Sequence, residues 1–283
     1  MRPALPALLL GAVFIALSPI FVRLSEAGPI ATAFWRVALA VPVLWILTFT
    51  VKKPVGGLSV PKVLFLAAGI AFAGDLVFWH KAIQFTSVAN STLLANLASI
   101  FVTLAGWILW RERPRPLFLV ALALALGGVV LRVHTSLDFS ATALLGDALG
   151  VVTAMFYAWY ILAVKGLRDR GAATLQVMAV TTTLTAVIIF PVALASGERL
   201  LPSSACGWGI LLGLAWIAHA AGQGLIAYAL AHLPAAFSSV GLLLQPVVAA
   251  LLAWILLSEP LVALQIAGGL VVLVAIWLAR RAS

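Results

Sequence analysis

The sequence is poor in charge and in cysteine, and it lacks the short motifs of soluble chemistry. Charged residues make up 9% of its 283 residues, against about 25% in an ordinary soluble domain. The single cysteine, Cys206, excludes an internal disulfide and a multi-cysteine metal site, so we expect it to be a small packing residue. The chain has no phosphate-binding Gly-rich loop, no His-Glu-x-x-His and no Gly-x-Ser-x-Gly. We therefore expect no ATP hydrolysis, no metal and no cofactor.

The sequence is correspondingly rich in apolar residues. They form 64% of the chain, against about 45–50% in a soluble domain, and a soluble core cannot hide that excess from water. The net charge of +9 is spread over short connections and forms no patch, which argues against nucleic acid as a partner. The composition therefore predicts the lipid bilayer as the partner.

The apolar residues gather in ten runs, each near the length of about 20 residues that a spanning helix needs. The runs are continuously apolar and do not alternate as barrel strands do, so we predict an all-α integral membrane protein. The first run, from Ala4 to Val22, is longer than the apolar core of a signal peptide, and we expect it to be retained. The predicted helices span residues 4–24, 30–50, 61–84, 88–110, 116–133, 143–166, 173–196, 206–231, 234–257 and 261–280.

The placement of lysine and arginine predicts the orientation. With the N-terminus inside, twelve of the seventeen Lys and Arg residues fall on the inner side and four on the outer side, while Arg36 lies within the second helix. Basic residues favour the cytoplasmic side of a membrane. We therefore expect a multi-pass protein of the cell membrane with both termini in the cytoplasm.

The fourth and ninth predicted helices align without a gap, which indicates an internal repeat. Five helices per repeat is an odd number, so the second repeat would cross the membrane in the opposite sense. Inverted repeats of this kind are a transporter architecture in which two halves enclose a midplane site. We predict two inverted five-helix repeats, residues 1–134 and 143–283. The matched residues are Trp107–Leu109 with Trp254–Leu256 and Glu112 with Glu259, at an offset of 147. After the glutamates the offset drops to 141, and Gly127-Gly128 matches Gly268-Gly269.

These features resemble the drug/metabolite transporter superfamily, and specifically chains with two EamA domains. The residues that carry the resemblance are Phe34–Arg36, Trp79–Ala82, Thr86–Asn90, Leu93–Leu97, Glu112, Gln245-Pro246, Glu259-Pro260, Gln265 and Gly268-Gly269. Ser99 stands where the family often has a proline, which the second repeat keeps as Pro246, so the sequence does not require a break in the fourth helix. The resemblance implies ten helices, cytoplasmic termini, a central cavity lined by helices 1, 3, 4, 6, 8 and 9, and export of amino acids or related metabolites.

Ionisable residues at membrane depth are costly and need a partner, water or a function. Asp75 and Trp79 share one face of the third helix, where a carboxylate and an indole suit a substrate ammonium. The alternatives are a structural pair of Asp75 with Arg36 and a neutral, hydrogen-bonded Asp75. Arg36 has the geometry to hold a carboxylate, or it serves a structural role. His80 suits proton coupling or substrate contact, unless it is an interfacial histidine.

Polar and aromatic residues form one-sided stripes on four other helices, and we expect the stripes to line a shared lumen. Helix packing, or an aromatic belt at the interface, is the alternative. The candidate substrate-binding residues on these stripes are Thr92, Asn96 and Ser99 on the fourth helix, Tyr157 and Tyr160 on the sixth, Trp216, His219 and Gln223 on the eighth, and Gln245 on the ninth.

The sequence thus predicts a secondary carrier for a small-molecule substrate, with amino-acid export foremost. Uptake of another small metabolite or drug-like solute is the alternative within transport. A membrane-embedded enzyme or a passive channel is an alternative of another class. The Gly-x-x-x-Gly pairs Gly146/Gly150 and Gly209/Gly213 suit packing within the bundle or contact in a homodimer, so monomer and homodimer both stay open.

Overall fold

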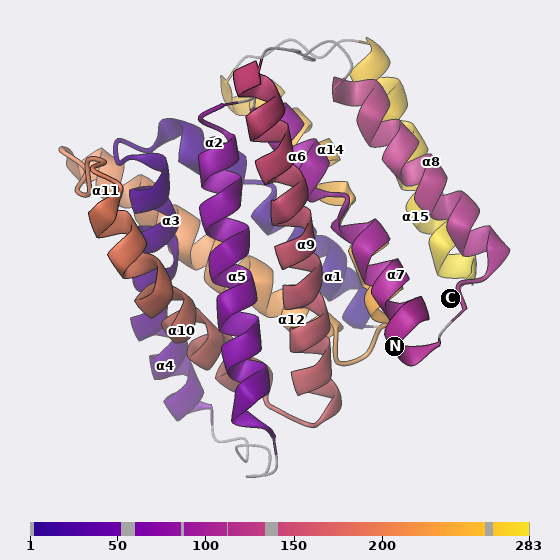
Figure 1. The fold of residues 1–283 in the computed structure, drawn as a ribbon, viewed down its shortest axis with the longest axis horizontal. Helices are drawn as coiled ribbons and strands as arrows, with labels where there is room; N and C mark the ends of the chain where they lie inside the picture. Colours follow the sequence, from indigo (N-terminus) through magenta and orange to yellow (C-terminus); the bar gives the residue numbers. More distant parts are fainter. Residues whose placement is uncertain are drawn as a thin grey trace.

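The computed structural model describes residues 3–51, 60–85, 88–111, 113–133, 141–257 and 263–282. This part of the chain is built of helices with no strand (Figure 1), which confirms the all-helical class. The helices are α1 (Ala4–Ile15), α2 (Ser18–Leu24), α3 (Pro29–Ala38), α4 (Ala40–Thr50), α5 (Lys62–Ala82), α6 (Val88–Ala95), α7 (Ala98–Trp110), α8 (Pro116–Val133), α9 (Ala141–Asp169), α10 (Thr174–Ala195), α11 (Ala205–Gly213), the π-helix η2 (Leu214–Gln223), α12 (Gly224–Ala229), α13 (Ala235–Gly241), α14 (Leu244–Leu257) and α15 (Ala263–Ala282).

Seven stretches of the described chain are long and apolar enough to cross a membrane. They are Ala4–Leu24, Pro29–Thr50, Lys62–Ala82, Leu144–Asp169, Thr174–Ala195, Ala205–Ala229 and Ala235–Leu256, and shorter apolar helices cover Ala98–Leu109 and Pro116–Gly127. Large apolar side chains such as Phe49 (75% exposed) and Ile108 (73% exposed) lie on the outside of the bundle. The fold is therefore that of a multi-pass membrane protein, with apolar side chains turned to lipid.

Three of the predicted continuous helices are interrupted, and a proline explains each interruption. Pro19, Pro42 and Pro246 follow the ends of α1, α3 and α13 by four or five residues. A proline has no N–H and its ring clashes with the carbonyl four residues before it, so the helix ends or kinks there. Each of the predicted helices 4–24, 30–50 and 234–257 thus corresponds to one stretch long and apolar enough to cross a membrane, with a local break in the helix.

The fourth predicted helix is also broken, between α6 and α7, although it has no proline. The Asn96 side-chain Nδ2 donates to the Thr92 carbonyl oxygen at 2.7 Å, and the backbone N–H groups of Leu97 and Ser99 bond three residues back instead of four. Asparagine competes with the helix backbone in this way. At the repeat offset of 147, this break falls within about one residue of the break between α13 and α14.

Helix contacts, taken together with the predicted repeat, indicate two groups within the bundle. The first group is α5, α6, α7 and α9; the second group is α1, η2, α12, α13 and α14. Each group mixes the two predicted repeats, because α9 packs on α5, α6 and α7 while α1 packs on η2, α12, α13 and α14. If each helix is replaced by its counterpart in the other predicted repeat, the first group becomes the second. Outside both groups, α8 and α15 pack on each other at one edge of the bundle (Figure 1).

The long helix α10 bonds to three neighbours through its threonines. Thr183 Oγ1 accepts from Trp45 Nε1 at 3.0 Å, Thr185 Oγ1 donates to the Gly69 carbonyl oxygen at 3.1 Å, and Thr182 Oγ1 lies 2.9 Å from His219 Nε2. These bonds join α10 to α4, α5 and η2. The threonine-rich segment is therefore a structural support for helices of both groups.

Candidate functional site

A cavity lies between the two helix groups, with about 630 Å³ of space not filled by atoms, its open mouth included. The first group supplies Asp75, Leu76, Trp79, Thr92, Ala95, Asn96 and Tyr157; the second group and the adjoining α2 supply Ile15, Ala16, Ser18, Pro19, Gln223, Gln245 and Ala249; Arg36 comes from α3. Eight of the thirteen residues predicted from sequence line this space: Arg36, Asp75, Trp79, Thr92, Asn96, Tyr157, Gln223 and Gln245.

Two opposite charges, Arg36 and Asp75, lie at the same depth in the bundle. We call the end of the bundle that carries residues 25–28 and 196–204 the Glu26 face. Arg36 stands seven residues after the first residue of α3 and Asp75 seven residues before the last residue of α5, so each is roughly 10 Å from this face along its helix. Arg36 is 5% exposed, its Nε has no hydrogen-bond partner in the protein, and its Cζ lies 5.9 Å from the centre of the Phe72 ring.

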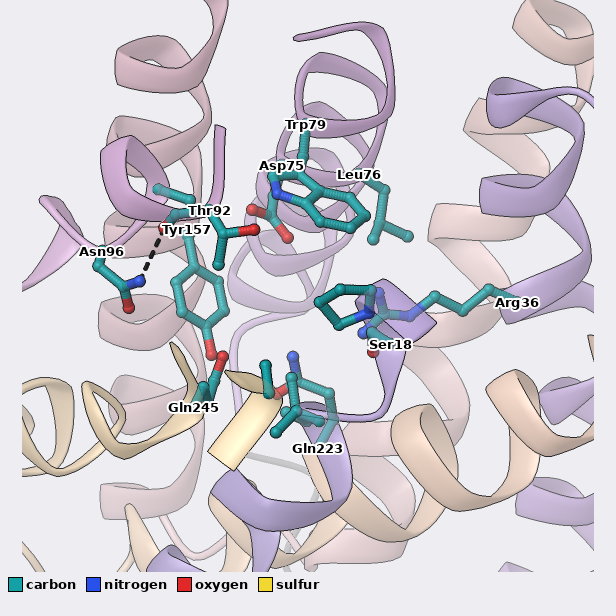
Figure 2. Close-up of a pocket in the computed structure, with 15 residues that line it drawn as sticks. Ser18, Arg36, Asp75, Leu76, Trp79, Thr92, Asn96, Tyr157, Gln223 and Gln245 are labelled. Atoms are coloured by element: carbon teal, nitrogen blue, oxygen red, sulfur yellow. Dashed lines mark hydrogen bonds between the residues drawn. The ribbon is translucent and has the colours of Figure 1, made fainter. Parts of the chain in front are cut away.

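Deeper in the bundle the cavity is lined by neutral polar groups. In Figure 2 the Tyr157 hydroxyl points toward Gln245, and Gln223 lies at the bottom of the view. The Tyr157 hydroxyl, Gln223 Oε1 and Gln245 Nε2 are buried, and the side chains of Gln245 and Gln223 interact with the Tyr157 hydroxyl. The three side chains therefore form one buried polar cluster at this end of the cavity.

The break between α6 and α7 places the Asn96 side chain at the cavity. Its Nδ2 is used by the Thr92 carbonyl oxygen, and Figure 2 shows Asn96 on the same side of the cavity as Tyr157. The other predicted members of this stripe point elsewhere. Ser99 is 2% exposed and donates to the Ser239 carbonyl oxygen at 2.8 Å, which joins α7 to α13.

His80, Tyr160 and His219 lie outside the cavity lining. His80 is fully buried, and its Nδ1 donates to the Leu76 carbonyl oxygen at 2.7 Å. The rings of Tyr160 and His219 stack on Phe72, with centroid distances of 4.6 and 5.2 Å. Phe72 also contacts the Arg36 guanidinium. Tyr160 and His219 thus pack against Phe72, on the side of the cavity that carries Arg36.

Trp216 is on the outside of the bundle, and it is 47% exposed. Its Nε1 donates to the Leu39 carbonyl oxygen at 3.1 Å, at the kink between α3 and α4. The expected common face of Trp216, His219 and Gln223 assumed α-helical spacing. The structure has a π-helix there, whose wider turns direct the three side chains differently. Only Gln223 of the three reaches the cavity.

Sequence reasoning missed Ser18, which is 4% exposed and lines the cavity. Its Oγ has no hydrogen-bond partner in the protein. The signal was the pair Ser18-Pro19, because a proline within an apolar run opens the helix backbone where discontinuous membrane helices form binding sites.

Two glutamates form hydrogen bonds between segments at the Glu26 face. Glu26 accepts hydrogen bonds from the backbone N–H and side-chain hydroxyl groups of Ser203 and Ser204, just before α11. These bonds lower the pKa of Glu26 to about 2. Glu198 accepts from the N–H groups of Ile30 and Ala31 at the start of α3, at 2.7 and 3.2 Å, and from Gln84 Nε2 at 2.9 Å. Glu198 thus caps α3, and Glu26 holds Ser203 and Ser204 just before α11, so each glutamate bonds to a segment of the other predicted repeat.

The model of the EamA-like transporter family matches residues 2–133 and 144–281. An uncharacterized transporter of Archaeoglobus fulgidus is 32% identical over 186 residues, which is 63% of this chain and 62% of that protein. The pseudopaline exporter CntI of Pseudomonas aeruginosa strain PAO1 is 25% identical over 244 residues, or 86% of this chain and 82% of that protein. The chain thus aligns with less than two thirds of the archaeal protein.

A crystal structure of another protein superposes with a TM-score of 0.85, covering 99% of each chain at 14% identity. At that identity the likeness concerns the fold alone. It shows that the overall helix arrangement of this chain also occurs in another solved structure.

Proposed function

The chain belongs to the EamA-like transporter family, and on that premise we propose that it is a secondary carrier that exports amino acids or related small metabolites by alternating access. The carrier has ten spanning helices in two inverted repeats, residues 1–134 and 143–283. Both termini lie in the cytoplasm, and the protein sits in the cell membrane.

One observation carries the proposal: a cavity with a largely apolar lining, one carboxylate and one guanidinium lies between two helix groups of an apolar bundle. Charges at this depth are costly, so a cavity that keeps both has a use for them. An amino acid has an ammonium group for Asp75 and a carboxylate for Arg36. Trp79, beside Asp75 on α5, offers a ring face to the same ammonium.

The helix contacts support alternating access by the two helix groups. Replacing each helix by its counterpart in the other predicted repeat converts one group into the other. Such a relation is expected where inverted repeats give a transporter its outward-open and inward-open states. Contacts that cross between the groups lie below the cavity, away from the Glu26 face: Ser99 with Ser239, and Arg168 Nε with the Ala227 carbonyl oxygen at 3.2 Å. We propose that tilting one group against the other breaks these contacts and opens the cavity to the second side.

Export is supported by the relative named as a pseudopaline exporter, although its substrate is a property of that protein. An uptake carrier remains the second candidate, because the same cavity would serve either direction. Glu112 and Glu259, which carried part of the repeat argument, lie outside the described residues.

The test is counterflow in proteoliposomes. Vesicles are preloaded with unlabelled amino acids one at a time, and uptake of labelled threonine, methionine or glutamine is measured with and without a pH gradient. Acceleration by an internal preload identifies a carrier, because a channel shows no such trans-stimulation. Uptake that no preload accelerates would refute amino-acid exchange and direct the search to other solutes.

A further inference from the structure

The helix pair α8 and α15 stands apart from the cavity. The two helices pack on each other at one edge of the bundle, and among the described residues that line the cavity none comes from either helix. Figure 1 shows that the start of α8 and the end of α15, marked C, lie at the same end of the pair. A site at that end of the pair is therefore separate from the cavity.

This end of the pair is strongly basic. Residues 111–115, which lead into α8, contain three arginines and one glutamate, and the last turn of α15 contains two more arginines. All five arginine side chains are exposed. Two segments far apart in the sequence thus bring their positive charges to one place. We call this surface the basic edge, which consists of Arg111, Arg113, Arg115, Arg280 and Arg281.

Helix dipoles explain only part of this charge. The C-terminal end of a helix favours cations, which suits Arg280 and Arg281, but the start of a helix disfavours them. The three arginines nevertheless precede α8, whose first turn contains no acidic residue. The five arginines also outnumber the single glutamate between them in residues 111–115. The basic edge therefore has positive charge to offer to an external anion.

Exposed apolar side chains continue from the basic edge along both helices. Leu117 and Val120 on α8 are 43% and 53% exposed, and Trp277 on α15 is 49% exposed. The Arg281 guanidinium lies over the Trp277 ring, with its Cζ 3.9 Å from the ring centre. Tryptophan rings and the stems of basic side chains are typical of the boundary between lipid headgroups and acyl chains. Positive charge followed by apolar surface matches a phospholipid, in which the phosphate is joined to acyl chains.

We propose that the basic edge binds the headgroup of an acidic phospholipid, such as phosphatidylglycerol, while the acyl chains lie along the exposed apolar side chains of α8 and α15. A soluble phosphate compound would use the arginines but leave the apolar surface without a ligand. With both termini in the cytoplasm, as proposed above, this end faces the inner leaflet, whose acidic lipids attract basic segments next to membrane helices. The inference goes beyond the proposed function and does not depend on what the cavity carries.

The experiment is native mass spectrometry of the full chain, released from micelles that contain equal amounts of phosphatidylglycerol and phosphatidylcholine with the same acyl chains. We expect the protein to retain phosphatidylglycerol about tenfold more than phosphatidylcholine, because only the first carries a net negative charge. Equal retention of the two lipids would overturn the inference. Millimolar glycerol phosphate should leave the bound lipid in place, and displacement of the lipid would show that the arginines take a soluble phosphate instead.

The variant Arg113→Gln/Arg281→Gln removes one charge from each segment of the basic edge. It should lower the preference for phosphatidylglycerol at least threefold, to about threefold or less over phosphatidylcholine. The matched control is Lys62→Gln/Arg170→Gln, which removes two exposed charges at the start of α5 and just after α9. The control should keep the preference of the parent protein. An equal loss in both variants would overturn the inference, because the total charge of the protein would then attract the lipid.

Discussion

The two helix groups around the cavity share a plan but contribute differently to it. The first group crosses the bundle on two unbroken helices, α5 and α9, and supplies the carboxylate of Asp75 with the rings of Trp79 and Tyr157. The second group supplies neutral side chains and is interrupted near the cavity, after α1, along η2 and between α13 and α14. The comparison indicates that the carboxylate and the aromatic rings come from regular helices, whereas the second group supplies neutral contacts from interrupted helices, and Arg36 comes from α3 outside both groups.

The largest expected effect is that of Asp75→Asn, which tests the charge on the first group. It keeps the shape of the side chain and removes its charge, so a bound ammonium loses its partner. We expect a loss of trans-stimulated uptake of about 100-fold or more, measured by counterflow at fixed protein density. The control is Asp169→Asn, which alters only a surface pair with Lys165 at 2.5 Å. Normal transport by Asp75→Asn would refute the assignment.

A cross-link tests whether the two helix groups, rather than the two sequence repeats, move as units. Leu94 on α6 and Gly150 on α9 belong to different repeats but to the same group, and a Cβ at Gly150 would lie 2.9 Å from the Leu94 Cβ. Disulfides need about 3.5–4.5 Å between Cβ atoms, so a small shift suffices. In a Cys206→Ser background, we expect the oxidised pair Leu94→Cys/Gly150→Cys to keep uptake within about threefold of the reduced protein.

The contrasting cross-link joins the two groups. Cysteines at Ser99 and Ser239, bridged by a short bifunctional reagent, would hold together the α7–α13 contact that must open. We expect uptake to fall to background and to stay normal for either single cysteine. Full transport with this bridge would contradict opening at the α7–α13 contact. A complete block by the bridge within the first group would favour movement of the sequence repeats as rigid halves.

The variant Gln223→Leu probes the neutral contribution of the second group. Leucine keeps most of the volume but cannot pair with a polar substrate group, so substrate affinity should fall about tenfold while the maximal rate changes little. The concentration dependence of counterflow separates the two effects. An equal loss with norleucine as substrate would mean that Gln223 supports the helix, and that its amide does not contact the substrate.

The same comparison explains how far the sequence predicted the site. Helix ends agree with the structure to within about three residues, because apolar length and Gly-Pro signals determine them. The face assigned to Asp75 and Trp79 holds because α5 is a regular helix. Trp216 and His219 were placed with Gln223 on the assumption of α-helical spacing, and the π-helix separates them. Contacts such as Thr182 with His219 join distant helices, and no local pattern in the sequence shows them.

The smallest expected effect concerns the Glu26 face, where Glu26 bonds to Ser203 and Ser204 just before α11 and so ties this segment to the chain between α2 and α3. The pKa of Glu26 is lowered from 4.5 to about 2, so its stabilising contribution is present above pH 4.5 and is lost as the pH falls through about 2. The variant Glu26→Gln should therefore melt at a lower temperature than the parent at pH 7 and pH 5, and the difference should shrink at pH 3. Thermal unfolding in detergent at these three pH values measures it. Glu198→Gln is the companion variant, because it loosens the contact of α3 with Gln84 at the end of α5. A melting difference for Glu26→Gln that is the same at pH 3 and pH 7 would show that the carboxylate charge is not what holds this face together.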